Sequence, residues 1–459
     1  MLLNDIDKNK PIHMIGIGGT SMSGIAEIVV NMGFKVSGSD MTLSPVTDRL
    51  EKTGIKIFKG HFAENVESAG FVVYTAAISL DNPELTRAKE LNIPMMERSE
   101  FLGEITKLYN KTISICGTHG KTTTTSMVAL AFIEAGKDPT IQVGADIKGL
   151  NNLNYRVGKS PYFILESCEY VRSFLKFHPQ TATVLNIEED HLDCYKDLED
   201  IKSAFREFVL SVPETGYVIV NSDNKNCMDV VQDLKCEVIT VGIDNKNADF
   251  YADNIKISEN GCYNFEVHFD NQVFPIQLSV LGYHNVYNAL AAIATCIVHE
   301  VPIEAIQKAL TSFTGASRRF EYVGMINGAK IFDDYAHHPT EIKATIEAAT
   351  KMKYNKMWVV FQPHTYTRTK SLFSEFVNAF DKVDNLILID IYAAREKDDG
   401  TISSKMLADE INKIHDNCTY ISTLEAAAEY LKTHAMPNDL LLTIGAGTVT
   451  KIGYMIKEN

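Results

Sequence analysis

Short apolar runs and longer amphipathic stretches follow one another along almost the whole chain of 459 residues. Runs such as KTISIC (residues 111–116) and GYVIVN (216–221) end in glycine or polar residues, which is typical of buried strands that lead into loops. The stretches between such runs have the spacing of helices. This alternation predicts an α/β fold in which mostly parallel sheets carry flanking helices.

The alternation falls into three successive units, which predicts three domains with boundaries near residues 107 and 314. We expect a Rossmann-like N-terminal domain (1–107), a central domain with a phosphate loop (108–314) and a Rossmann-like C-terminal domain (315–459). Residues 249–281 differ, because polar and apolar residues alternate there between turn signals. That pattern predicts an antiparallel region inside the central domain.

Composition excludes some classes of protein. The formal net charge of −15 argues against non-specific binding of nucleic acid, which depends on Lys and Arg. No apolar run approaches the roughly 20 residues that span a bilayer, and residues 1–10 are too polar for a secretory signal. The eight cysteines include no CxxC pair, which indicates reduced thiols. We expect a cytoplasmic protein, monomer or homodimer, without a nucleic-acid or membrane partner.

The segment GTHGKTTTT, residues 117–125, lies between an expected strand and an expected helix. Glycines allow backbone N–H groups to converge on phosphate oxygens, and the helix adds its positive N-terminal end. Lys121 can reach the β- and γ-phosphates of ATP, and a hydroxyl of Thr122 or Thr123 can bind Mg²⁺. Ile115 stands where the strict phosphate-loop pattern has its first glycine. The expected ATP-binding residues of this loop are Gly117, Thr118, His119, Gly120, Lys121, Thr122 and Thr123.

Acidic side chains follow the next two expected strands of the central domain. Glu166 and Glu169 end the first of these, and the second ends in Glu188, Glu189, Asp190, His191 and Asp193. Ligands of open α/β sheets bind at the carboxyl ends of strands, where the phosphate loop also lies. A carboxylate and an imidazole at this edge could hold Mg²⁺ against the phosphates of ATP.

A second glycine-rich turn occurs at HMIGIGGTSMSG, residues 13–24. It predicts that the N-terminus of the following helix faces a diphosphate. Ser21 stands where a dinucleotide fingerprint has glycine, so NAD(P) is poorly matched, although Asp40 sits where an acidic residue would meet a ribose. A dehydrogenase therefore remains an alternative. A non-catalytic nucleotide sensor is a further alternative, but the presence of Lys121, Glu169 and His191 argues against it.

Several motifs together resemble the Mur ligases of peptidoglycan synthesis. They are GTHGKTTTT, ESCEY, NIEEDHLD, GYHNVYNAL, SRRF and DDYAHHPTE, and they occur in this order along almost the whole chain. Within that family, HMIGIGGTSMSGIAE and QPHTYTRTK are most similar to members that act on UDP-N-acetylmuramate and L-alanine. The rival inside the family is a ligase that joins a preformed tripeptide to the same sugar nucleotide.

The resemblance implies a reaction and a division of labour among the three domains. ATP phosphorylates the lactyl carboxylate of UDP-N-acetylmuramate, and the amine of L-alanine attacks the acyl phosphate. The N-terminal domain binds the UDP-sugar, the central domain binds ATP and Mg²⁺, and the C-terminal domain closes over ATP and the amino acid.

The resemblance also implies roles for particular residues. The catalytic residues would be Lys121, Glu169, His191 and His337, and the metal ligands Thr122, Glu166, Glu169 and His191. The UDP-sugar would contact Gly18, Gly19, Ser21, Met22, Ser23 and Asp40. Asn285 or Asn288 would lie near adenine, Arg319 and Asp334 would contact the nucleotide, and His337 and Arg368 would bind L-alanine.

Two positions depart from the family pattern. Thr365 stands where many of these ligases have arginine, so one expected cation is missing from the amino-acid loop. Arg206 stands where sister ligases use a carbamylated lysine, and a guanidinium cannot take that part in bridging a second metal.

Overall fold

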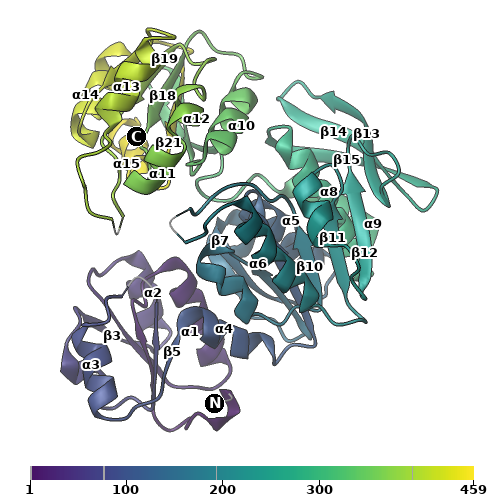
Figure 1. Cartoon of the computed structure of the whole chain (residues 1–459), viewed down its shortest axis with the longest axis vertical. Helices are drawn as coiled ribbons and strands as arrows, with labels where there is room; N and C mark the ends of the chain where they lie inside the picture. The colour runs from purple at the N-terminus through teal and green to yellow at the C-terminus, as the bar shows by residue number, and fades with distance from the viewer. Residues whose placement is uncertain (1–2, 76–77, 193, 395, 459) are drawn as a thin grey trace.

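The computed structural model describes residues 3–75, 78–192, 194–394 and 396–458, and the chain forms three lobes in sequence order. Figure 1 shows the N-terminal lobe in purple, the central lobe in blue to teal, and the C-terminal lobe in green to yellow. Each lobe is organised around its own β-sheet with helices packed against it, so the predicted three-domain α/β architecture is confirmed.

The N-terminal sheet is entirely parallel, with the strand order β3-β2-β1-β4-β5. Its strands are β1 Ile12–Ile15, β2 Val36–Asp40, β3 Lys56–Lys59, β4 Phe71–Tyr74 and β5 Met95–Glu97, and its helices are α1 Thr20–Asn31, α2 Pro45–Lys52, α3 Pro83–Glu90 and α4 Arg98–Thr106. The pattern did not predict β3, because this edge strand is a four-residue KIFK segment with no buried residue.

The central sheet has ten strands in the order β15-β14-β13-β12-β11-β10-β6-β9-β7-β8. They are β6 Lys111–Cys116, β7 Thr140–Ile147, β8 Leu153–Arg156, β9 Tyr162–Glu166, β10 Thr181–Val184, β11 Tyr217–Asn221, β12 Glu237–Gly242, β13 Phe250–Ile257, β14 Cys262–Phe269 and β15 Gln272–Leu281. Strands β13 to β15 pair antiparallel, as predicted for residues 249–281. The antiparallel pair of β7 and β8 at the opposite edge was not predicted.

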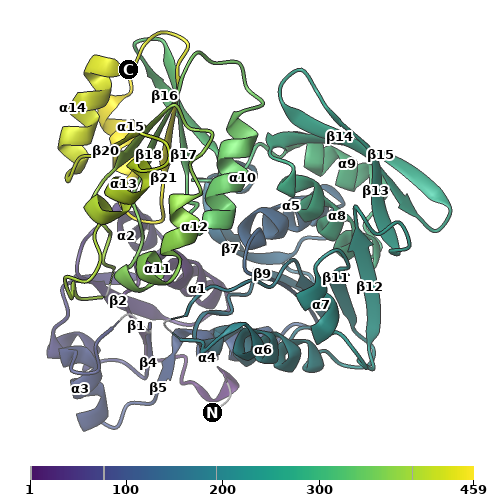
Figure 2. The ribbon, with the colours of Figure 1, turned by 45° about the horizontal axis from the view of Figure 1, so that its top comes forward.

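Helices cover the central sheet on both faces, and Figure 2 separates α5 and α8 from α6 and α7. These helices are α5 Lys121–Glu134, α6 Leu198–Leu210, α7 Lys225–Val230, α8 His284–Ile297 and α9 Ile303–Ser312. Short 3₁₀ turns lie at η1 Leu3–Asp5, η2 Ala63–Val66, η3 Lys148–Leu150 and η4 Tyr170–Lys176.

The C-terminal sheet has the order β16-β17-β21-β18-β19-β20, in which only β16 runs antiparallel to its neighbour. Its strands are β16 Glu321–Ile326, β17 Ala329–Asp334, β18 Met357–Phe361, β19 Asn385–Leu388, β20 Cys418–Tyr420 and β21 Leu440–Ile444. Its helices are α10 Pro339–Ala349, α11 Tyr366–Ser371, α12 Phe373–Val377, α13 Ser404–Asn412, α14 Leu424–His434 and α15 Thr450–Ile456.

The N-terminal and central lobes share an apolar core, and the C-terminal lobe does not take part in it. One continuous cluster contains N-terminal residues such as Phe101 together with central residues such as Phe174 and Phe208. The two clusters of the C-terminal lobe contain only residues of that lobe among those the structure describes. The N-terminal and central lobes are therefore held together by apolar packing, whereas the C-terminal lobe has a core of its own.

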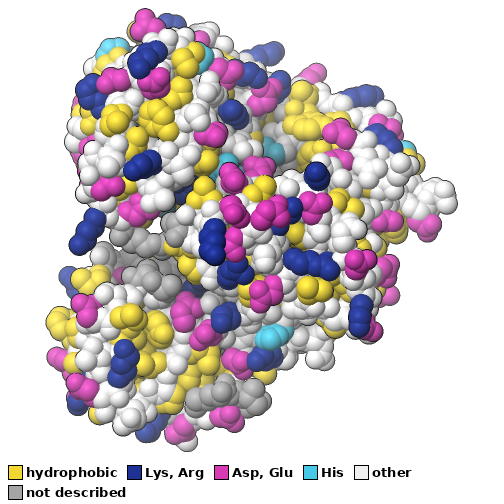
Figure 3. All heavy atoms as spheres, viewed as in Figure 1, with side chains coloured by type: hydrophobic (Ala, Val, Ile, Leu, Met, Phe, Trp, Pro, Cys, Tyr) yellow, Lys and Arg dark blue, Asp and Glu magenta, His cyan; other side chains and the backbone are white. Residues whose placement is uncertain are grey.

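Among the described helices, none is both long enough and apolar enough to cross a membrane. On the face shown in Figure 3, Lys and Arg side chains are scattered among acidic ones and form no continuous basic surface.

Candidate active site

The phosphate loop lies between β6 and α5, as the sequence predicted. Gly117 and Gly120 have φ angles of 141° and 85°, a region that L side chains rarely adopt. A Cβ at Gly120 would lie 2.3 Å from Asn288 Oδ1. Asn186 holds the loop through its side chain, which accepts from His119 N at 2.7 Å and donates to His119 O at 3.1 Å. The role of Asn186 was not predicted.

Lys121 is the first residue of α5, and its ammonium group is turned into the loop. Nζ lies 3.0 Å from Glu169 Oε2 and donates to the carbonyls of Gly117 and Thr118 at 2.6 and 2.9 Å. Burial alone would lower the pKa of Lys121, but Glu169 outweighs it and raises the pKa above its usual range. Lys121 is therefore a fixed positive charge.

The predicted metal ligands lie close together only in part. Of the predicted ligands, Glu169 and His191 come together, with His191 Nε2 3.5 Å from Glu169 Oε1. One ligand atom of each lies within 4.8 Å of the other and of Cys168, which was not predicted as a ligand. His191 has a φ of 55°, a strained value for a non-glycine residue that is found disproportionately at functional sites. Glu166 instead accepts the N–H of Gly144 at 2.8 Å. Asp193 lies outside the described residues.

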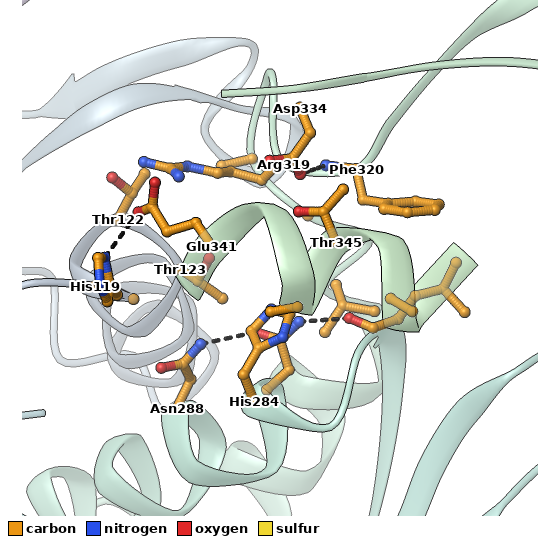
Figure 4. A pocket seen from close by; sticks show the side chains of 18 of the residues that line it. His119, Thr122, Thr123, His284, Asn288, Arg319, Phe320, Asp334, Glu341 and Thr345 are labelled. Carbon is orange, nitrogen blue, oxygen red and sulfur yellow. Dashed lines mark hydrogen bonds and ion pairs between the residues drawn. The ribbon is translucent and has the colours of Figure 1, made fainter. Parts of the chain in front are cut away.

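A cavity of about 490 Å³ opens beside the phosphate loop, between the central and C-terminal lobes (Figure 4). The predicted ATP-binding residues that line it are His119, Gly120, Thr122, Thr123, Asn285, Asn288, Arg319 and Asp334. Gly117, Thr118 and Lys121 are not part of its lining. The cavity also has walls that the sequence did not single out, including Tyr287, Phe320 and Glu341.

Hydrogen bonds within the protein fix the side chains of two asparagines and one aspartate that line this cavity. Asn288 Nδ2 donates to Asn285 Oδ1 at 2.8 Å, and Asn285 donates to the carbonyl of Leu281 at 2.6 Å. Asp334 accepts from the backbone N–H groups of Phe320 and Ala336 at 2.7 and 2.8 Å. Burial raises the pKa of Asp334 to about 6.

His337 and Arg368 lie on one side of the C-terminal lobe with His364 between them. The rings of His337 and His364 are 6.0 Å apart, and Arg368 Nη1 is 3.3 Å from His364 Nδ1. Burial lowers the pKa of His337 to about 4, so its imidazole is neutral at pH 7. Nδ1 lies 3.0 Å from the carbonyl of Tyr335 and is assigned the proton, which leaves Nε2 as the acceptor.

The guanidinium of Arg368 crosses to the central lobe. Its Nη2 and Nε lie 2.9 and 3.1 Å from Asp190 Oδ1, and the side chains are only 10% and 6% exposed. The sequence did not predict this ion pair. Thr365 caps α11 by accepting from Arg368 N.

The predicted UDP-sugar residues surround the first turn of α1. Gly18 N donates to Asp40 Oδ2 at 3.0 Å, and Ser21 Oγ accepts from Arg98 Nη1 and Gln142 Nε2 at 3.0 and 2.9 Å. The side chains of Met22 and Ser23 are buried, and the N–H of Ser23 donates to the carbonyl of Gly19 at 2.9 Å, so of these two residues only Met22 could turn a backbone N–H to a diphosphate. Gly19 is the N-cap of α1. The contact of Arg98 was not predicted.

Arg206 lies on α6, where its guanidinium donates to the carbonyl of Val230 at 2.9 Å. The group around the expected metal position consists of Cys168, Glu169 and His191, and Arg206 offers no carboxylate, thiolate or imidazole that could join it. The carbamylated lysine of sister ligases therefore has no counterpart of similar chemistry at this position.

The fold and the site define a three-lobed α/β protein of the phosphate-loop, nucleotide-binding class. Three family models match successive segments: "Mur ligase family, catalytic domain" over residues 11–110, "Mur ligase middle domain" over 115–296, and "Mur ligase, glutamate ligase domain" over 318–447. The chain belongs to the Mur ligase family, and the predicted resemblance is confirmed.

Individual relatives are similar over nearly the whole chain. The UDP-N-acetylmuramate–L-alanine ligase of Acetivibrio thermocellus is 52% identical over 99% of this chain and 97% of its own length. The crystal structure of UDP-N-acetylmuramate-alanine ligase MurC from Thermotoga maritima matches with a TM-score of 0.82 at 27% identity, over 97% of this chain and 98% of that one. The murein peptide ligase Mpl of Psychrobacter arcticus matches with a TM-score of 0.74 at 25% identity, with the same coverage.

Proposed function

We propose that this protein is an ATP-dependent ligase that joins L-alanine to the lactyl carboxylate of UDP-N-acetylmuramate during cytoplasmic synthesis of peptidoglycan precursors. The observation that carries the proposal is a series of contacts from the phosphate loop to the C-terminal lobe. Lys121 contacts Glu169, Glu169 contacts His191, His191 lies 3.7 Å from Asp190, and Asp190 binds Arg368. This arrangement supports a reaction in which phosphoryl transfer and attack by an amino acid occur side by side.

The proposal gives each lobe a ligand. Residues 1–107 would hold the UDP-sugar at the first turn of α1, where a helix N-terminus and Arg98 attract a diphosphate. Residues 108–314 would hold the triphosphate at the phosphate loop, and residues 315–459 would complete the ATP cavity and hold L-alanine. Asn285 or Asn288 would read adenine, with Arg319 and Asp334 at the nucleotide.

In the first step, an oxygen of the lactyl carboxylate forms a bond to the γ-phosphorus of ATP, the β–γ bridge breaks, and ADP leaves. Two anions must approach, so Lys121 and the backbone N–H groups of the loop offset the repulsion. Mg²⁺ would neutralise further phosphate charge, with Thr122, Glu169, Glu166 and His191 as the residues to hold it. The hydroxyl and carboxylate oxygens fit this ion, because Mg²⁺ prefers oxygen ligands.

In the second step, the amine of L-alanine attacks the acyl carbon, and the bond from that carbon to the phosphate oxygen breaks. The attacking nitrogen must lose a proton, and the neutral Nε2 of His337 is an acceptor with a suitable protonation state. Arg368 would orient the alanine carboxylate. Closure of the C-terminal lobe over the site would keep water from the acyl phosphate.

The test is release of ADP by the whole chain with UDP-N-acetylmuramate, ATP and Mg²⁺ and one amino acid at a time. We expect turnover with L-alanine and little with the tripeptide L-alanyl-γ-D-glutamyl-meso-diaminopimelate. Preference for the tripeptide would favour a tripeptide ligase instead, and release of ADP with neither acceptor would overturn the proposal.

A further inference from the structure

The contacts between the central and C-terminal lobes differ in kind from those within each lobe. Each lobe has separate apolar clusters, and the side-chain contacts described between the two lobes near the cavity are polar. Polar contacts between lobes can break and form again without exposing a hydrophobic core. The position of the C-terminal lobe therefore depends on a few hydrogen bonds and ion pairs.

One of these contacts begins on the phosphate loop itself. His119 Nδ1 lies 3.0 Å from Glu341 Oε1 of α10, and His119 Nε2 lies 3.4 Å from Glu188 Oε2 of its own lobe. Figure 4 shows the imidazole pointing from the loop to Glu341. Both side chains are largely buried, with 14% and 13% of their surface exposed. Burial would lower the pKa of His119, but Glu341 and Glu188 raise it to about 9, which keeps the imidazole charged at pH 7.

Glu341 connects this contact to the first turn of α10. Its Oε2 accepts the backbone N–H groups of His337 and His338 at 3.0 and 3.3 Å, as the third residue of a capping box. The same carboxylate thus binds the phosphate-loop imidazole through one oxygen and fixes the backbone of His337 through the other. A shift of the loop on nucleotide binding would move the residue proposed to receive the proton of L-alanine.

We propose that His119 and Glu341 are a positioning pair that couples occupation of the phosphate loop to the placing of His337 and the C-terminal lobe over the acyl phosphate. This inference rests on the proposed function and adds to it a role for two residues that touch neither the sugar nor the amino acid. The electrostatic reason is that two carboxylates beside a triphosphate would repel it, and the imidazolium between them offsets that repulsion.

The test is a double-mutant cycle with His119→Asn and Glu341→Gln in the full chain. Asn keeps a donor near the position of Nδ1, and Gln keeps a carbonyl oxygen that can cap α10, so both substitutions remove charge with little change of shape. Glu347→Gln is the matched control, because Glu347 lies on the same helix and pairs with Lys351 and Lys382 at the surface. A second cycle pairs His119→Asn with Glu188→Gln.

We expect Glu341→Gln to bind ADP alone within about threefold of the wild type. Its kcat/KM for L-alanine should fall about ten- to a hundredfold, because small misplacements near reacting groups have such effects. The double variant should be no worse than the worse single variant, since neighbours that act as a unit are not additive. Small-angle scattering with ADP and Mg²⁺ should show a less compact molecule for Glu341→Gln than for the wild type.

The proposed pair would be overturned if the effects of His119→Asn and Glu341→Gln on kcat/KM were additive, or if His119→Asn were coupled only to Glu188→Gln. It would also be overturned if Glu347→Gln lost as much kcat/KM for L-alanine as Glu341→Gln. If His119→Asn does not fold, Glu341→Gln still tests the proposal, because an unchanged KM for L-alanine and unchanged scattering would refute it. Failure of the proposed function is distinguishable, because the wild type itself would then release no ADP with L-alanine.

Discussion

At the scale of single residues, several charged side chains are buried, and each depends on specific partners. Lys121 and Glu169 are nearly buried, and each is stabilised by the other. Glu84 is fully buried in the N-terminal lobe, where it accepts from Ser39 Oγ at 2.7 Å and Asn65 Nδ2 at 2.6 Å. A buried ion is tolerated only where partners replace the water that it has lost.

Lys121→Ala should reduce release of ADP by at least about 10²–10³-fold, because the ammonium group stabilises charge on the transferring phosphoryl group. It should also destabilise the central lobe by about 3–5 kcal/mol, because Glu169 is left as a buried charge without its nearest cation. The double variant Lys121→Met/Glu169→Gln is the control, and we expect it to regain stability without activity. Near-normal turnover in either variant would show that the loop does not hold the triphosphate.

Glu84→Gln should destabilise the N-terminal lobe in a way that depends on pH. Burial alone would raise the pKa of Glu84, but hydrogen bonds from His13, Ser39 and Asn65 outweigh it and lower the pKa below its usual range. The stabilisation is therefore present above the unfolded pKa of about 4.3 and is lost as pH falls through the lower folded value. Urea denaturation from pH 7 to pH 3 should show the difference between the two proteins shrinking below about pH 4. A difference that is constant over this range would contradict the assignment.

At the scale of elements, the site depends on the backbone conformation of the loops that lead into helices. The phosphate loop reaches α5 only through two glycines with positive φ, and α8 packs so closely that Asn288 would meet any side chain at Gly120. The N-cap of helix α11 is a strained Thr365 with a φ of 67°, and the first turn of the helix carries Arg368. Local conformation thus decides which groups face the phosphate loop and which reach the neighbouring lobe.

Gly120→Ala should weaken binding of ADP and destabilise the central lobe, because its φ of 85° is strained and its Cβ would overlap Asn288. Gly136→Ala is the matched control at the other end of α5, with a φ of 71° and no heavy atom within 4 Å of the added carbon. We expect the free energy of unfolding of the control to fall by only about 1 kcal/mol, because alanine must adopt a positive φ there, and its affinity for ADP to be unchanged. Equal losses of ADP affinity in calorimetric titrations would show that steric contact at the loop is unimportant.

Arg368→Lys should raise KM for L-alanine about tenfold and KM for ATP much less, because an ammonium cannot reproduce the forked hydrogen bonds of a guanidinium. Asp190→Asn is the comparison, since it weakens the ion pair seen in the structure and leaves Arg368 in place. Steady-state kinetics with each substrate varied in turn separates the two roles. If Asp190→Asn has the larger effect on L-alanine, Arg368 acts by joining the lobes rather than by binding the amino acid.

At the scale of the whole molecule, the two junctions between lobes are built differently. The N-terminal lobe shares an apolar cluster with the central lobe, and Gly24 of α1 lies so near Tyr155 of β8 that a Cβ would be 3.2 Å from the Cβ of Tyr155. The C-terminal lobe is joined near the cavity through His119, Thr340, Arg368 and their partners. We expect movement between lobes to be concentrated at the second junction.

Gly24→Leu should separate the N-terminal and central lobes, because the close contact of α1 with β8 leaves no room for a branched side chain. Ligation should fall while binding of ADP to the central lobe persists, and small-angle scattering should show a larger radius of gyration. Gly24→Ala should lie between the wild type and Gly24→Leu, since its single added carbon requires a shift of only a few tenths of an ångström. Full ligation by Gly24→Leu would show that this junction does not need close packing.

The sequence by itself determined the α/β class, the three units, the antiparallel region at residues 249–281 and the phosphate loop, because each depends on local periodicity and turn chemistry. The resemblance to the Mur ligases was also evident from its motifs.

Only the tertiary structure decided which side chains meet across lobes, such as His119 with Glu341 and Asp190 with Arg368. The edge strand β3 and the hairpin of β7 and β8 were likewise undetermined, because their residues are stabilised by neighbouring strands rather than by a local pattern. Contacts between residues some 180 to 220 positions apart leave no periodic signal in one sequence, since packing and charge pair them only after each lobe has folded.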